Sequence, residues 1–199
     1  MTGKIVVGVT GASGAIYAQR FLRQIVPLYQ EIYLIMSEQA FQVASTELGI
    51  NITRQNFEAK AWLGIDAPNL KLLDEKNFYT PPASGSFVHD GMVIVPSSMG
   101  TAGRIAHGIS NDLLTRAADV CLKEGRKLIL VPREMPYNVI MLRNLTTLAE
   151  VGATIIPASP AWYHNPKSLE ELADTVVARI MQQLGLAQDL MKPWMSEEE

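Results

Sequence analysis

Two cationic side chains are spaced so that they could bind one anion. Arg116 and Lys123 lie seven residues apart in a stretch with helical periodicity, so two helical turns place them on nearly the same face. Lys123 comes near the end of that stretch, where the helix dipole favours a positive charge. Two aligned cations suit a phosphate group, and no Asp-rich magnesium motif accompanies them. The alternative is a solvent-exposed face on which Asp119 balances the charge.

Two turns rich in glycine and hydroxyl groups each follow an apolar run. Residues 10–15 read Thr-Gly-Ala-Ser-Gly-Ala, and residues 96–101 read Pro-Ser-Ser-Met-Gly-Thr. A helix that begins at such a turn exposes unpaired N–H groups and the positive end of its dipole, which suits a phosphate. The pattern G-x-G-x-x-G is absent, and Ser37 stands where an acidic residue would bind a ribose, so an NAD site is disfavoured. The alternatives are a turn without a ligand and a simple N-cap cluster.

A third segment combines a cation and a carboxylate. Arg133 and Glu134 follow another apolar run and are flanked by prolines, which stiffen the loop. A carboxylate beside cationic groups can relay protons to a phosphate, whereas the alternative is a salt-bridged turn. An aromatic loop, residues 160–166, follows the last apolar run and contains Tyr163 and His164. For that histidine a structural role is favoured over a catalytic one.

The elements that must position these residues alternate along the chain. Apolar, strand-like runs followed by helical patterns predict a parallel, doubly wound sheet with helices on both faces, a three-layer, Rossmann-like α/β fold. Ligands of such sheets bind beyond the carboxyl ends of the strands, where the turns described above lie. Residues 51–78 show little periodicity, and the Pro81-Pro82 pair is expected in a loop. The expected strands are residues 5–9, 32–36, 92–96, 127–132 and 153–157, and the expected helices cover residues 21–26, 38–48, 111–124, 138–151 and 168–184, with one more that ends at residue 107.

Length and composition limit the class of protein. The chain has 199 residues, of which 48% are hydrophobic and 19% charged, as in one globular domain. A formal net charge of −3 without a Lys/Arg-rich run disfavours a nucleic-acid surface. The single cysteine, Cys121, cannot form an internal disulfide, and the apolar runs are far shorter than a membrane span. The beginning of the chain lacks the layout of a signal peptide, and we therefore expect a cytoplasmic protein.

Taken together, five segments resemble the UbiX/Pad family of flavoproteins, and they follow that family's order over nearly the whole chain. The segments are residues 10–15, 81–86, 111–120, 131–134 and 162–166. The resemblance implies a flavin prenyltransferase that transfers a dimethylallyl group from dimethylallyl phosphate to N5 and C6 of reduced FMN, without a metal. It implies that the product, prenylated FMN, serves a UbiD-type decarboxylase, in ubiquinone biosynthesis for many bacteria. It also implies a homo-oligomer, a dodecamer in well-studied members, with the active site at a junction of subunits.

The resemblance further implies roles for individual residues. Those that would bind FMN are Gly11, Ala12, Ser13, Ser37, Ser98, Met99, Gly100, Thr101 and Arg133. Those that would bind dimethylallyl phosphate are Ser84, Arg116, Lys123, Tyr163, Arg179 and Trp194. Those that would act in catalysis are Glu47, Glu134, Lys123 and Ser13. Residues 1–185 would form the flavoprotein domain, and residues 186–199, with Trp194, a tail that packs on a neighbouring subunit. Phe78 and Ser97 depart from the family pattern, which has tryptophan and cysteine at these positions.

The chemistry that fits these residues is an alkyl transfer. The allylic C–O bond would ionise while Arg116, Lys123 and Arg179 stabilise the departing phosphate and aromatic rings stabilise the cation. Flavin N5 would then attack, and ring closure at C6 would require removal of a proton. Glu134, beside the phosphate, and Glu47, on the flavin side, are the candidates for that step.

Three alternatives stay open at this point. One is an FMN-dependent cysteine decarboxylase. Such enzymes use a histidine near the flavin, whereas the histidines of this chain do not lie in the corresponding motif. The cationic pair Arg116 and Lys123 would also have no role in that reaction. The second is direct decarboxylation of an aromatic acid. The third is a non-catalytic FMN carrier, which would bind FMN without adding mass to it.

Overall fold

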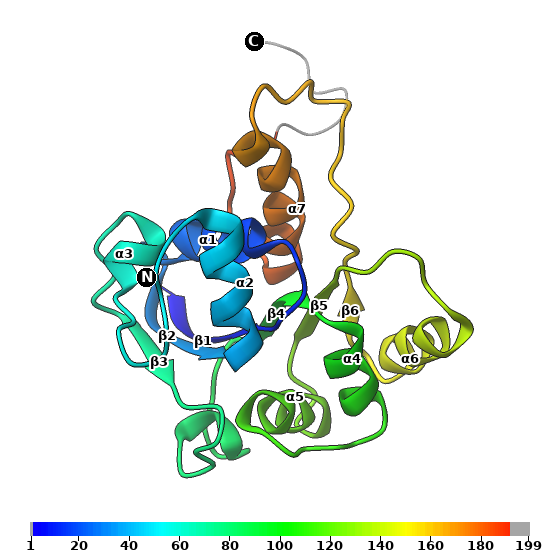
Figure 1. The fold of residues 1–199 in the computed structure, drawn as a ribbon. Coiled ribbons are helices and arrows are strands. Elements are labelled where there is room, and N and C mark those ends of the chain that lie inside the picture. The colour runs from blue at the N-terminus through cyan, green and yellow to red at the C-terminus, as the bar shows by residue number, and fades with distance from the viewer. Residues whose placement is uncertain (1, 192–199) are drawn as a thin grey trace.

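A six-stranded parallel sheet with the strand order β3-β2-β1-β4-β5-β6 forms the centre of the protein (Figure 1). The computed structural model describes residues 2–191. The order reverses between β1 and β4, so a ligand crevice is expected beyond the carboxyl ends of these two strands. The strands are β1 (Thr2–Val9), β2 (Tyr29–Met36), β3 (Leu70–Leu73), β4 (Met92–Ser97), β5 (Leu128–Pro132) and β6 (Thr154–Ile155).

Helices cover both faces of the sheet (Figure 1), which confirms the three-layer, doubly wound fold. One face carries α1 (Ala15–Ile25), α2 (Glu38–Leu48), α3 (Ala59–Leu63) and α7 (Leu169–Leu184). The other face carries α4 (Met99–Ala106), α5 (Leu113–Lys123) and α6 (Val139–Glu150). The central strands β4 and β5 are buried along their whole length, as continuous apolar runs predict for parallel strands.

Alternate side chains of each strand enter the two cores. Along β1, Ile5 and Val7 pack with the α1 and α7 layer, whereas Val6 packs with the α4 and α5 layer. The same alternation separates Val93 from Ile94 in β4. Because side chains point to opposite faces with a period of two, each apolar run supplies both cores at once.

The poorly periodic stretch contains two short elements that the sequence analysis did not assign. In β3, Leu70 pairs with Ile32 and Leu72 with Leu34, so β2 supplies the partner that fixes this strand. In α3, Trp62 is buried in the core. Both elements owe their form to tertiary packing, because such short segments carry little intrinsic preference.

Two further expectations are corrected. Residues 81–83 form a short 3₁₀ helix, η1 (Pro81–Ala83), rather than a plain loop, because a proline at the first helical position loses no hydrogen bond. The last strand keeps only Thr154–Ile155 of the expected residues 153–157. It lies at the sheet edge and pairs with β5 alone, through Ile129 and Leu130.

Polar side chains cap the N-termini of several helices. Ser37, Ser98 and Asn138 each accept a hydrogen bond from the first turn of their helices. At α7, Ser168 Oγ accepts the N–H of Glu171, but the Glu171 carboxylate accepts the N–H of Lys167 at 2.6 Å, so Ser168 and Glu171 form only half of a capping box. The complete box lies at α5, where Asp112 and Thr115 bind one another reciprocally.

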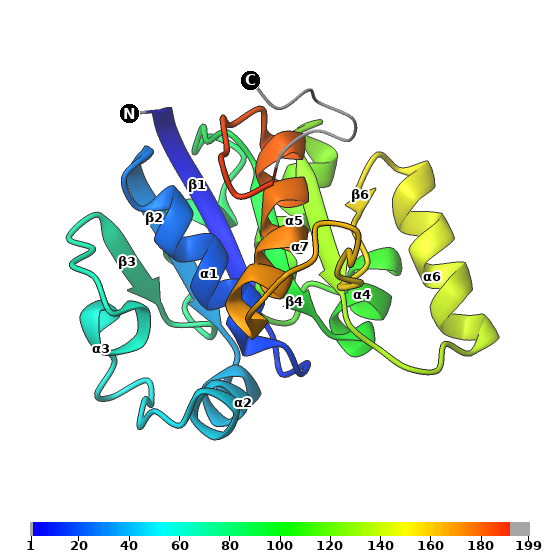
Figure 2. The same cartoon turned by 90° about the horizontal axis from the view of Figure 1, so that it is seen from above.

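Helix α6 packs unlike the others. Leu148 is its one buried residue, whereas Leu142, Val139 and Ile140 are 50%, 58% and 64% exposed. Figure 2 shows α6 at one side of the molecule, beyond the edge strand β6. Exposed large apolar side chains gathered at one end of a helix are typical of a surface that is covered in an assembly.

Candidate active site

A pocket rich in hydroxyl groups lies at the carboxyl ends of β1, β2 and β4. It has a volume of about 390 Å³, and its lining residues are Thr10, Gly11, Ser37, Gln39, Ser98, Gly100, Thr101 and Arg104. Ser37 caps α2 and Ser98 caps α4, so two helix N-termini meet there. Thr10 joins the two turns: its Oγ1 accepts the N–H of Ser98 at 2.7 Å and donates to the carbonyl of Pro96 at 2.8 Å. Paired helix N-termini with hydroxyl donors suit a phosphate.

Close packing explains the glycine of the first turn. A Cβ atom built on Gly11 would lie 2.4 Å from Cβ of Gln39. A side chain at this position would therefore push the turn away from the beginning of α2. The other predicted flavin residues of the two turns differ in exposure: Ala12 and Met99 are buried, whereas Ser13 and Gly100 are exposed.

The first turn holds a carboxylate. Glu47 of α2 accepts hydrogen bonds from the backbone N–H groups of Gly14 and Ala15, at 2.9 and 2.8 Å. These N–H groups belong to the first glycine-rich turn, which the sequence predicts as a place for a phosphate. In this structure Glu47 occupies them and stabilises the positive end of α1.

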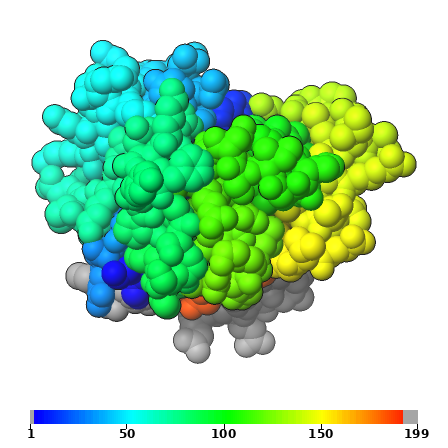
Figure 3. All heavy atoms as spheres, turned by 90° about the horizontal axis from the view of Figure 1, so that it is seen from below, coloured from blue at the N-terminus to red at the C-terminus, as the bar shows by residue number. Residues whose placement is uncertain are grey.

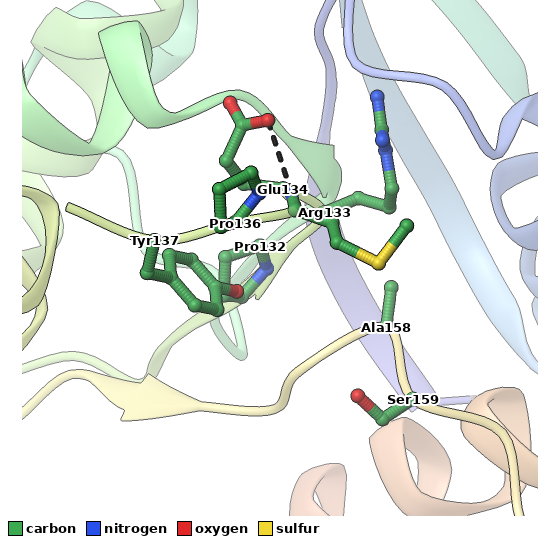
Figure 4. Close-up of a pocket in the computed structure, with 8 residues that line it drawn as sticks. Pro132, Arg133, Glu134, Pro136, Tyr137, Ala158 and Ser159 are labelled. Atoms are coloured by element: carbon green, nitrogen blue, oxygen red, sulfur yellow. Dashed lines mark hydrogen bonds between the residues drawn. The ribbon is translucent and has the colours of Figure 1, made fainter.

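A second pocket follows β5 (Figure 4). Its volume is also about 390 Å³, and its lining residues are Pro132, Arg133, Glu134, Met135, Pro136, Tyr137, Ala158 and Ser159. Glu134 Oε1 accepts the N–H of Met135 at 3.1 Å. Figure 4 shows the side chains of Arg133 and Glu134 pointing away from one another, so the salt-bridged turn that was the alternative does not form.

Arg133 lines the second pocket. Its backbone N–H donates to the carbonyl of Ser97 at 3.2 Å, which ties the loop after β5 to the end of β4. Burial raises the pKa of Tyr17 on α1, and the positive charge of Arg133 partly opposes that rise, which places the guanidinium near α1. Nε of Arg133 is buried without a hydrogen-bond partner in the described chain. A ligand acceptor or a water molecule could satisfy such a donor.

The cations of α5 face the segment around η1. Arg116 Nε donates to the carbonyl of Ala83 at 3.1 Å, and its Nη1 to Asp119 at 3.0 Å. Lys123 forms an ion pair with Glu124. A Cβ on Gly85 would lie 2.9 Å from Lys123 Nζ. Both cations therefore face residues 83–85, as their spacing predicts.

Arg126, which the sequence analysis missed, holds this segment against α5. It donates to the carbonyl of Phe87 at 2.8 Å and also to the carbonyl of Gly85. Ser84, a predicted substrate residue, is exposed, and its Oγ lies 2.8 Å from Oγ of Ser86. The space-filling view from below shows the segment before β4 lying against α5 in the molecular surface (Figure 3).

Other predicted substrate residues lie elsewhere. Arg179 is exposed on α7, which covers the face of the sheet opposite to α5, and its Nη1 donates to Gln182 at 2.7 Å. Tyr163 is half exposed in the loop before α7, with its ring 4.2 Å from that of His164. Trp194 lies outside the described residues. One chain therefore brings Arg116, Lys123 and Ser84 together but does not complete the predicted set.

The two positions that depart from the family pattern differ in their surroundings. Ser97 is fully buried at the end of β4. Phe78 is 41% exposed in the turn before η1. Within residues 2–191 no group of His, Cys, Asp and Glu side chains could hold a metal ion, and no helix there is long and apolar enough to cross a membrane.

A doubly wound sheet with a hydroxyl-lined pocket at two helix N-termini is typical of nucleotide-binding proteins. The model of the Flavoprotein family matches residues 2–184. Flavin prenyltransferase UbiX of Pseudomonas aeruginosa is 42% identical over 195 residues, which cover 96% of this chain and 93% of that protein. The chain belongs to the Flavoprotein family and, within it, to the flavin prenyltransferases of the UbiX type.

Solved structures agree with this family. The crystal structure of AnUbiX (PadA1) in complex with FMN and dimethylallyl pyrophosphate has a TM-score of 0.88 and 35% identity and covers 100% of both chains. A dodecameric FMN-dependent UbiX-like decarboxylase from Escherichia coli O157:H7 has a TM-score of 0.81 and 36% identity, over 92% of this chain and 95% of that chain. The peptidyl-cysteine decarboxylase EpiD, at 18% identity and a TM-score of 0.60, shares the fold alone.

Proposed function

We propose that this protein is a flavin prenyltransferase that transfers a dimethylallyl group from dimethylallyl phosphate to N5 and C6 of reduced FMN. Family membership supports the activity. The observation that carries the flavin site is the buried Nε of Arg133, which has no hydrogen-bond partner in the described chain and belongs to a residue that lines the second pocket. A buried donor without an acceptor is costly, and a flavin at this place would supply one.

The residues of the site fit FMN. The hydroxyl groups of Ser37, Ser98 and Thr101 and the two helix N-termini suit the phosphate. Arg133 would donate to the polar edge of the ring, and the pocket with Glu134 would receive the substrate beside it. Reduced FMN would supply the nucleophilic nitrogen and carbon of the reaction.

Arg116 and Lys123 would bind the substrate phosphate and stabilise the charge that develops on it when the allylic C–O bond breaks. In the described chain Arg116 donates to Asp119 and Lys123 pairs with Glu124, so a phosphate would compete with these carboxylates. Glu134, whose carboxylate lines the second pocket, would accept the proton that ring closure releases. Glu47 would hold the first turn and act on the flavin side.

A neighbouring protomer would complete the site. Arg179 and Tyr163 lie away from the cations of α5 in one chain, and α6 offers an open apolar face. Since a structural relative is dodecameric, we expect a homo-oligomer, and a dodecamer as its form. Residues 186–199, with Trp194, would pack on the neighbour, which leaves residues 1–185 as the flavoprotein domain. A UbiD-type decarboxylase would use the product of the reaction. The cytoplasmic location of the protein stays a prediction.

Mass spectrometry of the flavin tests the function. The purified protein is incubated without oxygen with reduced FMN and dimethylallyl phosphate, and a parallel sample receives dimethylallyl pyrophosphate. A gain of one C5 unit on FMN is the expected result. Bound FMN without a mass gain would favour the carrier, and release of carbon dioxide from an aromatic acid or a cysteine substrate, without a partner protein, would favour a decarboxylase.

A further inference from the structure

Arg104 is the charged residue of the hydroxyl-lined pocket. Seven of the eight lining residues are uncharged, and no carboxylate is among them. Arg104 lies near the end of α4, yet its Nη2 donates to Oγ1 of Thr101, one turn earlier, at 3.2 Å. Helical side chains lean toward the N-terminus of their helix, which explains this direction. The guanidinium is thereby held on the side of the pocket where α4 begins.

The beginning of α4 is one half of an anion site, and α2 supplies the other half. Ser98 Oγ accepts the N–H of Thr101 at 3.2 Å, and Ser37 Oγ accepts the N–H of Ala40 at 3.1 Å. Both helices direct the positive ends of their dipoles at the pocket that Arg104 lines. The neighbouring pocket is lined by the carboxylate of Glu134 as well as by Arg133, whereas a cation and no carboxylate line the pocket of Arg104. The charged end of a flavin nucleotide therefore belongs in the pocket of Arg104.

Two residues beyond α4 keep the guanidinium in place. Arg104 Nη1 donates to Asn111 Oδ1 at 2.7 Å and forms an ion pair with Asp112, the N-cap of α5. With the bond to Thr101, these contacts use three of the five guanidinium N–H groups. The remaining donors suit a bidentate contact with phosphate oxygens, for which arginine geometry is adapted.

We propose that Arg104 binds the phosphate of the flavin nucleotide and makes the protein select FMN over riboflavin. The inference rests on the proposed function only in taking FMN as the ligand. It concerns a residue that neither the glycine-rich turn nor the capping serines reveal, because its role depends on contacts from Asn111 and Asp112. Its effect is confined to the phosphate, since riboflavin differs from FMN by that group alone.

Binding of the two flavins separates this role from a purely structural one. Dissociation constants for FMN and riboflavin are measured by calorimetry with the full-length protein, with Arg104→Met and with Arg104→Lys. We expect Arg104→Met to weaken FMN binding about 10- to 100-fold, as for loss of a charged hydrogen bond, and to change riboflavin binding less than about twofold. Arg104→Lys, which keeps the charge but loses the fork, should fall between. Arg23→Ala, which removes an exposed cation from the last turn of α1, is the control and should leave both constants unchanged.

A second variant keeps the test decisive if Arg104→Met does not fold. Asp112→Asn retains an N-cap but replaces the carboxylate oxygen that holds Arg104, so FMN should bind about threefold more weakly and riboflavin equally well. Unchanged FMN affinity in Arg104→Met or Arg104→Lys, equal weakening of both flavins, or unchanged FMN binding by Asp112→Asn would each overturn the proposal. A wild-type protein that binds no FMN would instead refute the proposed function.

Discussion

Glu47 of α2 binds the beginning of α1, where one of its carboxylate oxygens accepts the N–H of Gly14 at 2.9 Å. The same oxygen accepts the N–H of Ala15 at 2.8 Å. The side chain thus serves as an N-cap that comes from a residue far along the chain, while Gly14, the formal N-cap, has no side chain to offer. This contact holds the first turn of the proposed flavin site in place.

Replacing Glu47 by alanine removes that cap. The N–H groups of Gly14 and Ala15 lose their acceptor, and we expect the free energy of unfolding to fall by about 1 kcal/mol. Urea unfolding measures the change. Glu58→Ala is the matched control, because Glu58 precedes α3 and its side chain makes no capping hydrogen bond. Equal transition midpoints for Glu47→Ala and wild type would show that the contact contributes nothing.

Gly11→Ala should disrupt the hydroxyl-lined pocket. Its new Cβ would meet Cβ of Gln39 at 2.4 Å, so the first turn must move away from α2. We expect at least about tenfold weaker FMN binding, measured by calorimetry, together with a stability loss of about 1 to 3 kcal/mol, typical of overpacking. The double variant Gly11→Ala with Gln39→Gly removes the clash. It should bind FMN better than Gly11→Ala does, and the absence of any rescue would refute this explanation.

Gly85→Ala should affect the substrate rather than the flavin. A Cβ there would lie 2.2 Å from Glu124 Oε1 and 2.9 Å from Lys123 Nζ, so both flexible side chains must shift. We expect a severalfold higher KM for dimethylallyl phosphate with little change in FMN affinity or in stability. Steady-state kinetics and flavin binding provide the comparison. Gly125→Ala is the control. A Cβ at Gly125 would meet no other atom, but the positive φ of 63° makes the substitution strained. This variant should therefore lose stability without displacing Lys123. An unchanged KM in Gly85→Ala would contradict the assignment.

Glu134→Gln should slow ring closure. The amide cannot accept the proton, while the hydrogen bond to the N–H of Met135 can persist through the amide oxygen. We expect FMN binding to be kept and closure to slow at least about 100-fold in single-turnover absorbance measurements. The exposed Glu58→Gln is the control. Closure at the wild-type rate would remove Glu134 from the mechanism.

Cys121 should make stability depend on alkaline pH. Burial raises the pKa of its thiol from 9.0 to about 12, only partly offset by Arg126. Between these values the unfolded chain loses the thiol proton while the folded protein keeps it, so the free energy of unfolding falls as pH rises. In Cys121→Ala that part of the slope should be missing, as measured by urea unfolding from pH 8 to pH 10. Identical slopes would contradict the buried, protonated thiol.

The sequence predicts the local elements well, for a physical reason visible in particular residues. The apolar runs of β4 and β5 allow one buried strand conformation, and Ser37, Ser98 and Asn138 cap helices with their own neighbours. The seven-residue spacing of Arg116 and Lys123 likewise fixes their common face. Such features depend on residues within one or two turns, so they can be predicted without knowing the fold.

Contacts between distant segments required the tertiary structure. β3 exists because β2 offers a partner, and Glu47 reaches Gly14 because α2 packs beside α1. Arg104 meets Asp112 only through the turn between α4 and α5. The sequence by itself determined the order of the strands and helices except β3, α3 and η1, and it predicts the turns where a ligand would bind. Only the packing of distant segments decided which N–H groups bind Glu47 and which pocket contains the positive charge of Arg104. It also decided which cations lie together in one chain. These features depend on distances in space that no local sequence pattern encodes.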